Sequence, residues 1–458
     1  MRVAAGFTGA GLLIALAGGC AGGGGFAGAP AASAPAAVAA ESAFRSRRLP
    51  GMAVVVLQDA ATVLSRGYGY ADEERRRAVD ARTVFQLGSI GKQFLAALVV
   101  VLAGDGTLSL DDSVTRHVSG LAHVPPSVRV RHLLAHTSGI RELFQLPGAL
   151  DAFDDLSRTR QELFSAVRKA PVDFAPGSRW SYSNTNYTLL AMLVERLTGQ
   201  PYERAIVTRL LEPVGLRSLR ACRSIPDGPD DALGYVWDGT RNIPAAPENM
   251  EWIRGDGGFC GTAADLARWT HLLASGGIIP SQHYALMTEP TRLGPGAAVD
   301  YGFGLALARP DGVRKISHGG AMRGYSAQGA HYPDHKMTVV VLTNRGDVRA
   351  DAIEREIARA VLTVAAPDRS AVRLPPDARA AFVGRYDIGV FAIGVVPRGE
   401  GLWLETPPPG PTTALRYLGQ GSFVSDDEPD GVAIEFAADR RSLRLYMGAM
   451  HWYGTRVD

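Results

Sequence analysis

The chain has 458 residues, of which 46% are hydrophobic, and its 48 basic residues nearly balance 46 acidic ones, giving a net charge of +2. This length allows two or three domains with sizeable cores. Because the sequence has no basic stripe interleaved with aromatic side chains, it excludes an extended nucleic-acid interface. We therefore expect a globular protein with no nucleic-acid partner.

The first 20 residues predict an export signal. Arg2 places a positive charge before an apolar stretch that ends in small residues ahead of Cys20. This pattern resembles a bacterial lipoprotein signal, in which Cys20 carries the lipid; ordinary cleavage after Ala29 is the alternative. We expect an exported protein, periplasmic or in the cell envelope, with membrane attachment through lipid on Cys20. Residues 21–42, mostly Gly, Ala, Pro and Ser, are expected to form a flexible tether.

The central part of the chain predicts a sheet domain and a helical lobe. Two β-branched runs, Met52–Leu57 and Thr62–Tyr70, predict a hairpin. The apolar run Phe94–Leu102 predicts a buried helix that ends at Gly104. Amphipathic patterns dominate residues 108–285. Strands are then expected at Gly302–Leu307, Val313–Ile316, Ser326–Tyr332 and Met337–Leu342, and a helix closes the region at Ala350–Val364. We expect one α/β domain over residues 43–366, with a site in the groove between its lobes.

The last part of the chain predicts a separate small β domain. A proline-rich linker at residues 367–378 precedes short strands punctuated by Gly, Pro and Asp over residues 379–458. This pattern is typical of a small antiparallel domain of barrel type. We find no catalytic residues in it and interpret it as a stabilising or substrate-limiting appendage. Its expected strands are Val390–Val396, Leu402–Glu405, Val432–Phe436 and Leu443–Tyr446.

Two cysteines remain once Cys20 is assigned to the export signal. An exported pair can form a disulfide, but nothing in the sequence brings Cys222 and Cys260 close together. We therefore expect free or buried thiols at both positions.

The strongest catalytic signal is a serine three residues before a lysine at the start of the buried helix. Ser89 and Lys92 share one helix face in the first turn, where unpaired backbone N–H groups and the positive end of the dipole lie. The serine can attack a carbonyl while its own N–H holds the oxyanion, and the lysine can take the proton if its pKa is lowered. Arginine cannot give up its proton, and lysine is rare in this chain. Its four lysines are Lys92, Lys169, Lys315 and Lys336.

A polar and aromatic segment before a later helix offers Tyr182 and Asn184, two residues apart. A tyrosine whose phenolate is favoured by a neighbouring lysine can act as a general base and later as an acid. The Asn184 amide can orient Lys92 and bind a substrate amide. The alternative interpretation is a helix-capping cluster with a buried tyrosine.

A third segment, His318-Gly319-Gly320-Ala321, follows an expected strand at residues 313–316. Two glycines at a strand edge suggest close backbone approach by a ligand. The N–H of Ala321 is a candidate second oxyanion donor. The alternative interpretation is an ordinary turn.

Together, Ser89-x-x-Lys92, Tyr182-x-Asn184 and His318-x-Gly320 resemble the motif set of the class C β-lactamase-like serine hydrolases. That family includes D-alanyl-D-alanine carboxypeptidases, related penicillin-binding proteins, β-lactamases and esterases. The resemblance extends from Gly51 to Ala365, and the strands from Phe382 are similar to a lipocalin-like appendage of some members. It implies an antiparallel sheet flanked by helices plus an all-α lobe. Supporting segments are His132–Ile140, Phe174–Gly177, Gly257–Phe259 and Tyr301–Gly304.

The resemblance also implies roles for individual residues. Ser89 would be the nucleophile of a covalent acyl-enzyme, with Lys92 and Tyr182 sharing the proton transfers. The N–H groups of Ser89 and Ala321 would form the oxyanion hole, and no metal or cofactor is implied. The residues expected to bind a small-molecule ester or peptide substrate are Asn184, His318, Gly320 and Ala321.

Departures from the family pattern narrow the expected substrates. β-lactamases of this class usually carry Lys at the position of His318, and a largely neutral His pairs weakly with a drug carboxylate. We therefore expect an esterase or D-amino-acid amide hydrolase, with β-lactamase activity as an alternative. Cys260 stands where the family often has Ser or Thr. His132 and His136 are interpreted as hydrogen-bonded structural histidines.

Two other protein classes are alternatives to a β-lactamase-like serine hydrolase. An α/β-hydrolase requires a G-x-S-x-G turn, and the nearest match, Gly324–Gln328, fails at its last position. A non-catalytic envelope binding protein on the same fold remains an alternative, because folds can be retained for binding.

Overall fold

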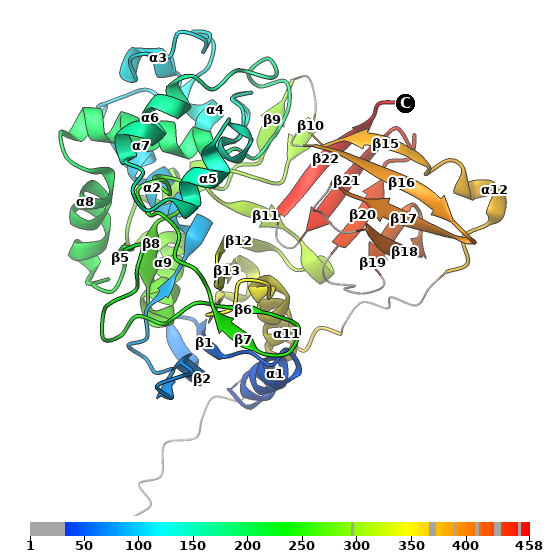
Figure 1. Cartoon of the computed structure of the whole chain (residues 1–458), viewed down its shortest axis with the longest axis horizontal. Coiled ribbons are helices and arrows are strands. Elements are labelled where there is room, and N and C mark those ends of the chain that lie inside the picture. The colour runs from blue at the N-terminus through cyan, green and yellow to red at the C-terminus, as the bar shows by residue number, and fades with distance from the viewer. Residues whose placement is uncertain are drawn as a thin grey trace, which may run out of the picture.

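The structure, a computed structural model, describes residues 33–294, 297–365, 372–388, 391–407, 412–425, 432–447 and 450–458. It consists of a helical lobe, a sheet domain and a C-terminal barrel (Figure 1). The expected signal segment with Cys20, and residues 21–32 of the expected tether, lie outside the described residues.

The described residues form the following elements. The α-helices are α1 (Ser33–Ser46), α2 (Gly91–Gly104), α3 (Val114–His117), α4 (Val130–Leu134), α5 (Ala149–Asp154), α6 (Arg160–Arg168), α7 (Asn184–Thr198), α8 (Tyr202–Ile206), α9 (Ala263–Ser275), α10 (Ser281–Met287), α11 (Ala350–Leu362) and α12 (Pro376–Arg379). The strands of the first two parts are β1 (Gly51–Gln58), β2 (Ala61–Asp72), β3 (Arg77–Ala78), β4 (Phe85–Gln86), β5 (Arg220–Ala221), β6 (Tyr235–Trp237), β7 (Asn242–Pro244), β8 (Phe259–Gly261), β9 (Thr291–Leu293), β10 (Ala297–Val299), β11 (Ala306–Ala308), β12 (Lys315–Met322), β13 (Tyr325–Tyr332) and β14 (Met337–Thr343). The barrel strands are β15 (Gly384–Asp387), β16 (Ala392–Arg398), β17 (Gly401–Glu405), β18 (Thr412–Gly419), β19 (Ser422–Ser425), β20 (Val432–Phe436), β21 (Ser442–Met447) and β22 (Met450–Arg456).

The central sheet is antiparallel, with strand order β11-β12-β13-β14-β1-β2-β3. Alternate residues of β1 enter different cores: Val54 faces α1 and α11, whereas Val55 faces the helical lobe. Because both faces of the sheet are covered, β1 and β14 are almost continuously apolar rather than alternating. The predicted hairpin and the predicted fold class, an antiparallel sheet flanked by helices plus an α lobe, are confirmed.

Helix α2 lies at the centre of the molecule, between the sheet and the helices α7 and α8. It begins as a single 3₁₀ turn, Gly88–Ile90, and ends at Gly104 as predicted. The amphipathic patterns of the lobe correspond to α4, α6, α7 and α9.

The N-terminal helix α1 corrects the expectation of a tether through residue 42. Residues 33–42 are helical, and α1 lies beside α11 on the outer face of the sheet (Figure 1). Ala36, Ala40 and Ala43 are buried, at the helical spacing of one face. The sequence did not indicate this buried alanine face, because alanine is common both in low-complexity tethers and in closely packed helices.

The strand expected at residues 302–307 is wrong for most of its length. Only Ala306 and Leu307 lie in β11, and the preceding residues form a loop. Gly302 and Gly304 permit this loop: a side chain at Gly302 would lie 2.0 Å from the Met287 carbonyl oxygen, and Gly304 has a φ of +67°. These glycines let the chain pass close to α10 and α2 instead of extending.

The eight C-terminal strands form a closed antiparallel barrel in which β15 pairs with β22. The prediction of a small barrel-like β domain is confirmed, and its similarity to lipocalins stays a prediction. Because closure pairs the first strand with the last, the barrel has no free sheet edge.

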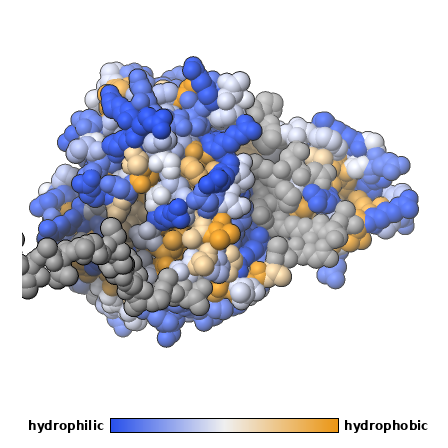
Figure 2. All heavy atoms as spheres, turned by 90° about the horizontal axis from the view of Figure 1, so that it is seen from below, coloured by the Kyte–Doolittle hydropathy of each residue, from blue (hydrophilic) through white to orange (hydrophobic). Residues whose placement is uncertain are grey.

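The surface in Figure 2 is mostly polar, with apolar side chains in small groups. Among the helices of the described residues, none combines the length and the apolar character needed to cross a membrane. The large apolar side chains that are most exposed in the described residues are Val38, Phe144, Leu150, Leu156, Ile225, Val372 and Val457.

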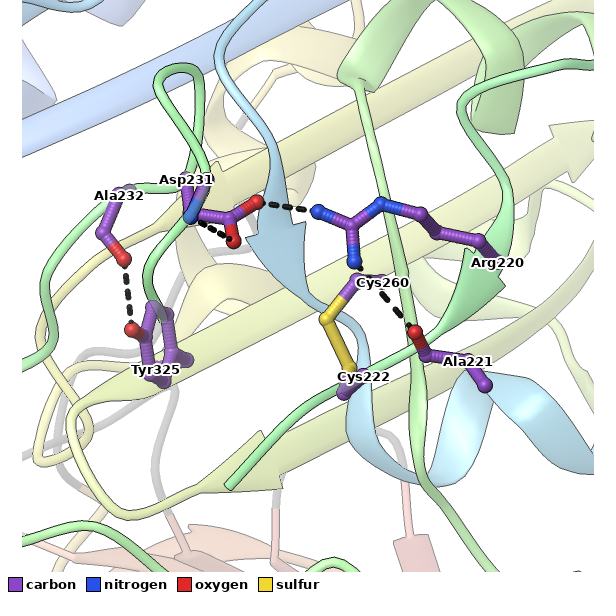
Figure 3. The surroundings of a disulfide bond; sticks show 8 residues. Arg220, Ala221, Cys222, Asp231, Ala232, Cys260 and Tyr325 are labelled. Carbon is purple, nitrogen blue, oxygen red and sulfur yellow. Dashed lines mark hydrogen bonds and ion pairs between the residues drawn. A yellow bond between two sulfur atoms is a disulfide. The ribbon is translucent and has the colours of Figure 1, made fainter. Parts of the chain in front are cut away.

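Cys222 and Cys260 form a disulfide, which corrects the expectation of free or buried thiols (Figure 3). Strand β8 lies between β4 and β5 in a three-stranded sheet, and the Cys222 N–H donates to the Gly258 carbonyl. This pairing brings residues 38 apart in sequence into contact. Short strands of two or three residues carry too little pattern to reveal that pairing from sequence.

We predict that breaking this disulfide destabilises the protein without preventing folding. Closing a loop of this length restricts the unfolded chain and contributes about 4 kcal/mol to the free energy of unfolding. The Cys222→Ser/Cys260→Ser variant should therefore unfold at a lower temperature in circular dichroism. Dithiothreitol should lower the midpoint of the parent but not that of the variant. Thiol titration should show that the parent is fully reduced. An unchanged unfolding midpoint of the fully reduced parent would contradict the prediction.

Candidate active site

The turn that carries Ser89 depends on a glycine. Gly88 has a φ of +51°, and a side chain there would lie 2.9 Å from the backbone N of Ala321. Ser89 follows within the 3₁₀ turn that opens α2 and remains partly exposed. Its backbone N–H therefore lies in the first turn, where amide groups lack partners within the helix.

Lys92 is fully buried one turn after Ser89. Its Nζ donates to Ser89 Oγ at 2.9 Å, to Asn184 Oδ1 at 2.8 Å and to the backbone carbonyl of Asp256. The rings of Tyr182 and Tyr187 lie with their centroids 4.9 and 5.6 Å from the same nitrogen. All three N–H bonds of the ammonium group thus have acceptors, one of which is the serine hydroxyl.

Burial lowers the pKa of Lys92 to about 8, although the negative charges of Asp256 and Glu142 oppose this shift. A lysine with this pKa is partly neutral in weakly alkaline solution. Its position and its pKa therefore allow Lys92 to accept the hydroxyl proton of Ser89.

Asp256 belongs to the site, and the sequence did not reveal it. Its side chain is buried, its Oδ1 has no hydrogen-bond partner among the described residues, and burial raises its pKa to about 7 against the opposing charge of Lys92. Glycines on both sides let this segment pass between α7 and the Ser89 turn: a side chain at Gly255 would lie 2.2 Å from the Tyr187 carbonyl oxygen, and one at Gly257 would lie 3.5 Å from the Gly88 carbonyl carbon. The glycines on either side of Asp256 are the sequence feature from which this close packing of the backbone could have been predicted.

Glu142 is the second acidic residue that the sequence did not reveal. Its carboxylate accepts hydrogen bonds from the backbone N–H of Asn184 and, at 2.7 Å, from Asn184 Nδ2. Because Nδ2 donates to Glu142, the amide oxygen of Asn184 faces Lys92. Burial raises the pKa of Glu142, while the hydrogen bonds from Asn184 lower it.

Tyr182 lies next to Lys92, but its ionisation differs from our expectation. The side chain is buried, its ring stacks on His136 with centroids 4.3 Å apart, and its hydroxyl has no hydrogen-bond partner among the described residues. Burial, and then the neighbouring Tyr301, raise the pKa of Tyr182 well above its ordinary value, although the nearby Ser89 hydroxyl opposes this shift. The expectation of a favoured phenolate is therefore wrong: the resting hydroxyl is protonated and can donate a proton.

His318 lies on the sheet side of the site in β12. Its Nδ1 is 2.7 Å from the Gly319 carbonyl, which can only accept, so Nδ1 carries the proton. Its Nε2, 3.0 Å from the Tyr301 hydroxyl, then accepts. Burial and the charge of Lys92 lower the pKa of His318 to about 4, so the ring is neutral at physiological pH.

Gly320 and Ala321 run directly beside the Ser89 turn. A side chain at Gly320 would lie 1.9 Å from the Leu87 carbonyl oxygen and 3.1 Å from the Ser89 nitrogen. The close approach at Gly320 is therefore that of the protein's own backbone, whereas we had expected the close approach of a ligand. Ala321 is exposed, and its peptide nitrogen lies next to Gly88. The segment His318–Ala321 continues strand β12 and is not a turn.

The two histidines of the segment 132–136 have partners outside the Ser89–Lys92 pair. His132 Nδ1 accepts from the Arg129 N–H at the start of α4, and His136 Nδ1 accepts from the Ser183 N–H. Across the described parts of the chain, no group of three or more His, Cys, Asp or Glu side chains is placed to hold a metal ion.

The structure thus brings together the residues that the sequence singled out. The chain matches the family model described as "Beta-lactamase" over residues 34–363, so it belongs to the β-lactamase family. This match starts within α1.

Two curated relatives are similar over much of the chain. The D-aminopeptidase of Brucella anthropi is 30% identical over 298 residues, which cover 64% of this chain and 56% of the relative. The penicillin-binding protein 4* of Bacillus subtilis is 29% identical over 385 residues, covering 77% of this chain and 83% of the relative. The chain thus spans just over half of the length of that D-aminopeptidase.

Two solved structures show the same fold. The octameric penicillin-binding protein homologue from Pyrococcus abyssi superposes with a TM-score of 0.66 at 24% identity, covering 92% of this chain and 99% of that one. The D-amino acid amidase from Ochrobactrum anthropi SV3, solved with D-phenylalanine, has a TM-score of 0.60 at 22% identity and covers 72% and 99%.

We predict that Asp256→Asn shifts the pH dependence of activity toward lower pH. The parent should gain kcat/KM through an ionisation near pH 8, because Lys92 must be neutral to accept a proton. The Asp256 charge raises the pKa of Lys92, so its removal lowers that pKa and moves the acid limb by about one pH unit. The measurement is a kcat/KM profile from pH 5 to 10.

The matched control is Asp59→Asn in the exposed β1–β2 turn, which has a positive φ that Asn tolerates. Its profile should coincide with that of the parent. The prediction would be contradicted if the Asp256→Asn variant kept the parent's melting temperature and its pH profile below pH 8 were unchanged. The charge of Asp256 would then not act on the pKa of Lys92.

Proposed function

We propose that this protein is a serine hydrolase that acts through an acyl-enzyme on Ser89. The observation that supports this proposal most directly is the 2.9 Å contact between Lys92 Nζ and Ser89 Oγ, in which the lysine is fully buried and has a lowered pKa. A buried lysine held against a partly exposed serine has little structural purpose, because a charge in this position is costly to desolvate.

In the proposed reaction, neutral Lys92 takes the proton of Ser89 Oγ as the oxygen attacks the substrate carbonyl. The N–H groups of Ser89 and Ala321 stabilise the negative oxygen. The bond to the leaving group then breaks as Tyr182 donates its proton to that group, and the ammonium of Lys92 returns a proton to Tyr182. Water hydrolyses the resulting ester by the reverse sequence and releases the acid. Asn184 and His318 would bind the substrate, and Gly320 allows the strand to approach Ser89.

The charges around Ser89 favour a substrate without a carboxylate near the reacting bond. His318 is neutral, and Glu142 and Asp256 place two acidic side chains near the single ammonium of Lys92. A positively charged amino group on the acyl side of the substrate is attracted by the negative potential of these two acidic side chains. The name of the relative D-aminopeptidase indicates substrates with such an amino group. We therefore propose D-amino-acid amides or esters as substrates. The same neutral His318 disfavours β-lactamase activity, because it offers no fixed charge to a drug carboxylate.

We also propose that the protein is exported to the periplasm or cell envelope and anchored by lipid on Cys20. The disulfide between Cys222 and Cys260 supports this location, since such bonds persist in oxidising compartments.

We predict that a Ser89→Ala variant loses the hydrolysis of p-nitrophenyl acetate and p-nitrophenyl butyrate. Removal of the nucleophile should lower kcat/KM by at least about a thousandfold, since a covalent route is lost. The measurement compares the purified parent and variant from residue 33 onward by release of p-nitrophenol. Mass spectrometry of the parent should show an acyl adduct on Ser89.

The matched variant is Lys92→Arg, which keeps the positive charge but cannot release its proton. It should be as inactive as Ser89→Ala while remaining folded. Equal hydrolysis by parent and Ser89→Ala would rule out the catalytic proposal and favour a binding protein of the same fold.

We further predict that a free amino group on the substrate increases activity. D-Phenylalanine p-nitroanilide should be hydrolysed with at least about tenfold higher kcat/KM than its N-succinyl derivative, because that derivative replaces the amino group with a carboxylate that the negative charges of Glu142 and Asp256 repel. The L-enantiomer serves as the stereochemical control. A preference for the succinyl compound would contradict the proposed substrate class.

A further inference from the structure

The C-terminal barrel and the catalytic segment share one hydrophobic cluster. On the hydrolase side this cluster contains Trp180, Tyr182 and Tyr301, and on the barrel side it contains Tyr386 and Ile388, all buried. The catalytic tyrosine candidate and the hydrogen-bond partner of His318 therefore belong to the same core as the barrel. Figure 1 shows β15 and β22 on the side of the barrel that faces β9, β10 and β11.

Two ion pairs join the same two parts of the molecule. Arg179 Nη1 lies 3.1 Å from Asp387 Oδ2 at the end of β15, and Arg444 Nη1 of β21 lies 3.1 Å from Asp300 Oδ2. Arg179 is three residues before Tyr182, and Asp300 immediately precedes Tyr301. All four side chains are partly exposed, so each pair contributes little energy but defines how the barrel is seated.

The backbone around Tyr182 has no regular secondary structure of its own. Residues 179–183 lie between a turn and the start of α7, in neither helix nor strand. The Tyr182 hydroxyl makes no hydrogen bond of standard geometry among the described residues, and the nearby polar group that acts on its pKa as a hydrogen-bond partner is the Ser89 hydroxyl. Two backbone hydrogen bonds, from Ser181 N–H to the His136 carbonyl and from Ser183 N–H to His136 Nδ1, anchor this segment on the side of the helical lobe. The shared cluster packs against its other side, so the orientation of the Tyr182 side chain depends on both.

We propose that the barrel is a positioning element of the active site: through Asp387, Ile388 and the shared cluster it holds the Tyr182 loop in the orientation needed for proton donation to the leaving group. This inference rests on the proposed hydrolase function. Tyr182 is the catalytic residue, whereas Arg179 and Asp387 act through it as positioning residues. The barrel is then part of the catalytic apparatus and not an appendage.

The proposal has a chemical signature that simple loosening of the fold lacks. An amide leaves as an amine and needs a proton from Tyr182, whereas p-nitrophenolate leaves without one. Deacylation uses Tyr182 with either substrate, but kcat/KM reports acylation alone, so displacing Tyr182 should lower kcat/KM for an amide much more than for a p-nitrophenyl ester. General destabilisation would lower both rates together.

The experiment is a charge exchange across the interface in the protein with its barrel. Arg179→Glu and Asp387→Arg should each lower kcat/KM for D-phenylalanine p-nitroanilide by about tenfold or more, with kcat/KM for p-nitrophenyl acetate changed by less than about twofold. The double variant Arg179→Glu/Asp387→Arg should recover most of the amide activity. Tyr182→Phe, which removes the proton donor itself, should lower kcat/KM for the amide at least as far as the single variants do.

A second charge exchange and a control variant keep the test decisive. Asp300→Arg and Arg444→Asp, alone and combined, repeat the exchange at the second pair and should give the same pattern. Arg398→Glu breaks the ion pair with Glu405 inside the barrel and should change neither activity.

Amide-to-ester ratios equal to that of the parent in the single variants would overturn the inference, as would an equal fall on both substrates with a lowered melting temperature. Failure of the proposed function is recognised separately, because the parent would then show no hydrolysis that depends on Ser89.

Discussion

The ammonium group of Lys92 is the constraint on which the rest of the site depends. A charge buried in a protein is stable only when its hydrogen bonds are satisfied and opposite charges lie near it. Here four separate parts of the chain supply these conditions: the Ser89 turn, the start of α7, the loop at Glu142 and the glycine-rich segment around Asp256. The requirements of one side chain therefore fix the mutual positions of segments that are far apart in sequence.

The same requirement sets the protonation states of the neighbours. Glu142 orients the Asn184 amide, so that its oxygen faces Lys92. Tyr182 stays protonated because it is buried, and His318 stays neutral because it is buried beside a cation. The result is a site that places a lysine with a lowered pKa beside a tyrosine with a raised one, which are the states that the proposed proton acceptor and proton donor require.

The sequence predicted most of the fold and the centre of the site, because those features have local patterns. The apolar run after Ser89 identified α2, and the β-branched runs identified β1 and β2. Ser89, Lys92, Tyr182, Asn184 and His318 were found through short motifs, and the structure brings them together. Their catalytic roles remain proposals.

What the sequence did not predict depends on contacts between distant segments. Glu142 and Asp256 look like ordinary loop acids until the fold places them beside Lys92. The disulfide pairs strands that are too short to recognise, and α1 is disguised by its alanine-rich composition. The expected phenolate at Tyr182 was wrong for a similar reason. The motif indicated that a cation lies nearby, which favours ionisation, but it did not indicate the burial that opposes ionisation.

The integration of α1 into the sheet domain has a consequence for the proposed lipid anchor. Its first residue, Ser33, is already part of a helix packed beside α11, so only thirteen residue steps separate it from Cys20. Even a fully extended chain of that length spans at most about 45 Å. A molecule held by lipid at Cys20 would thus keep its folded domain within one small-protein diameter of the bilayer, and its reachable substrates would be confined to that thin layer.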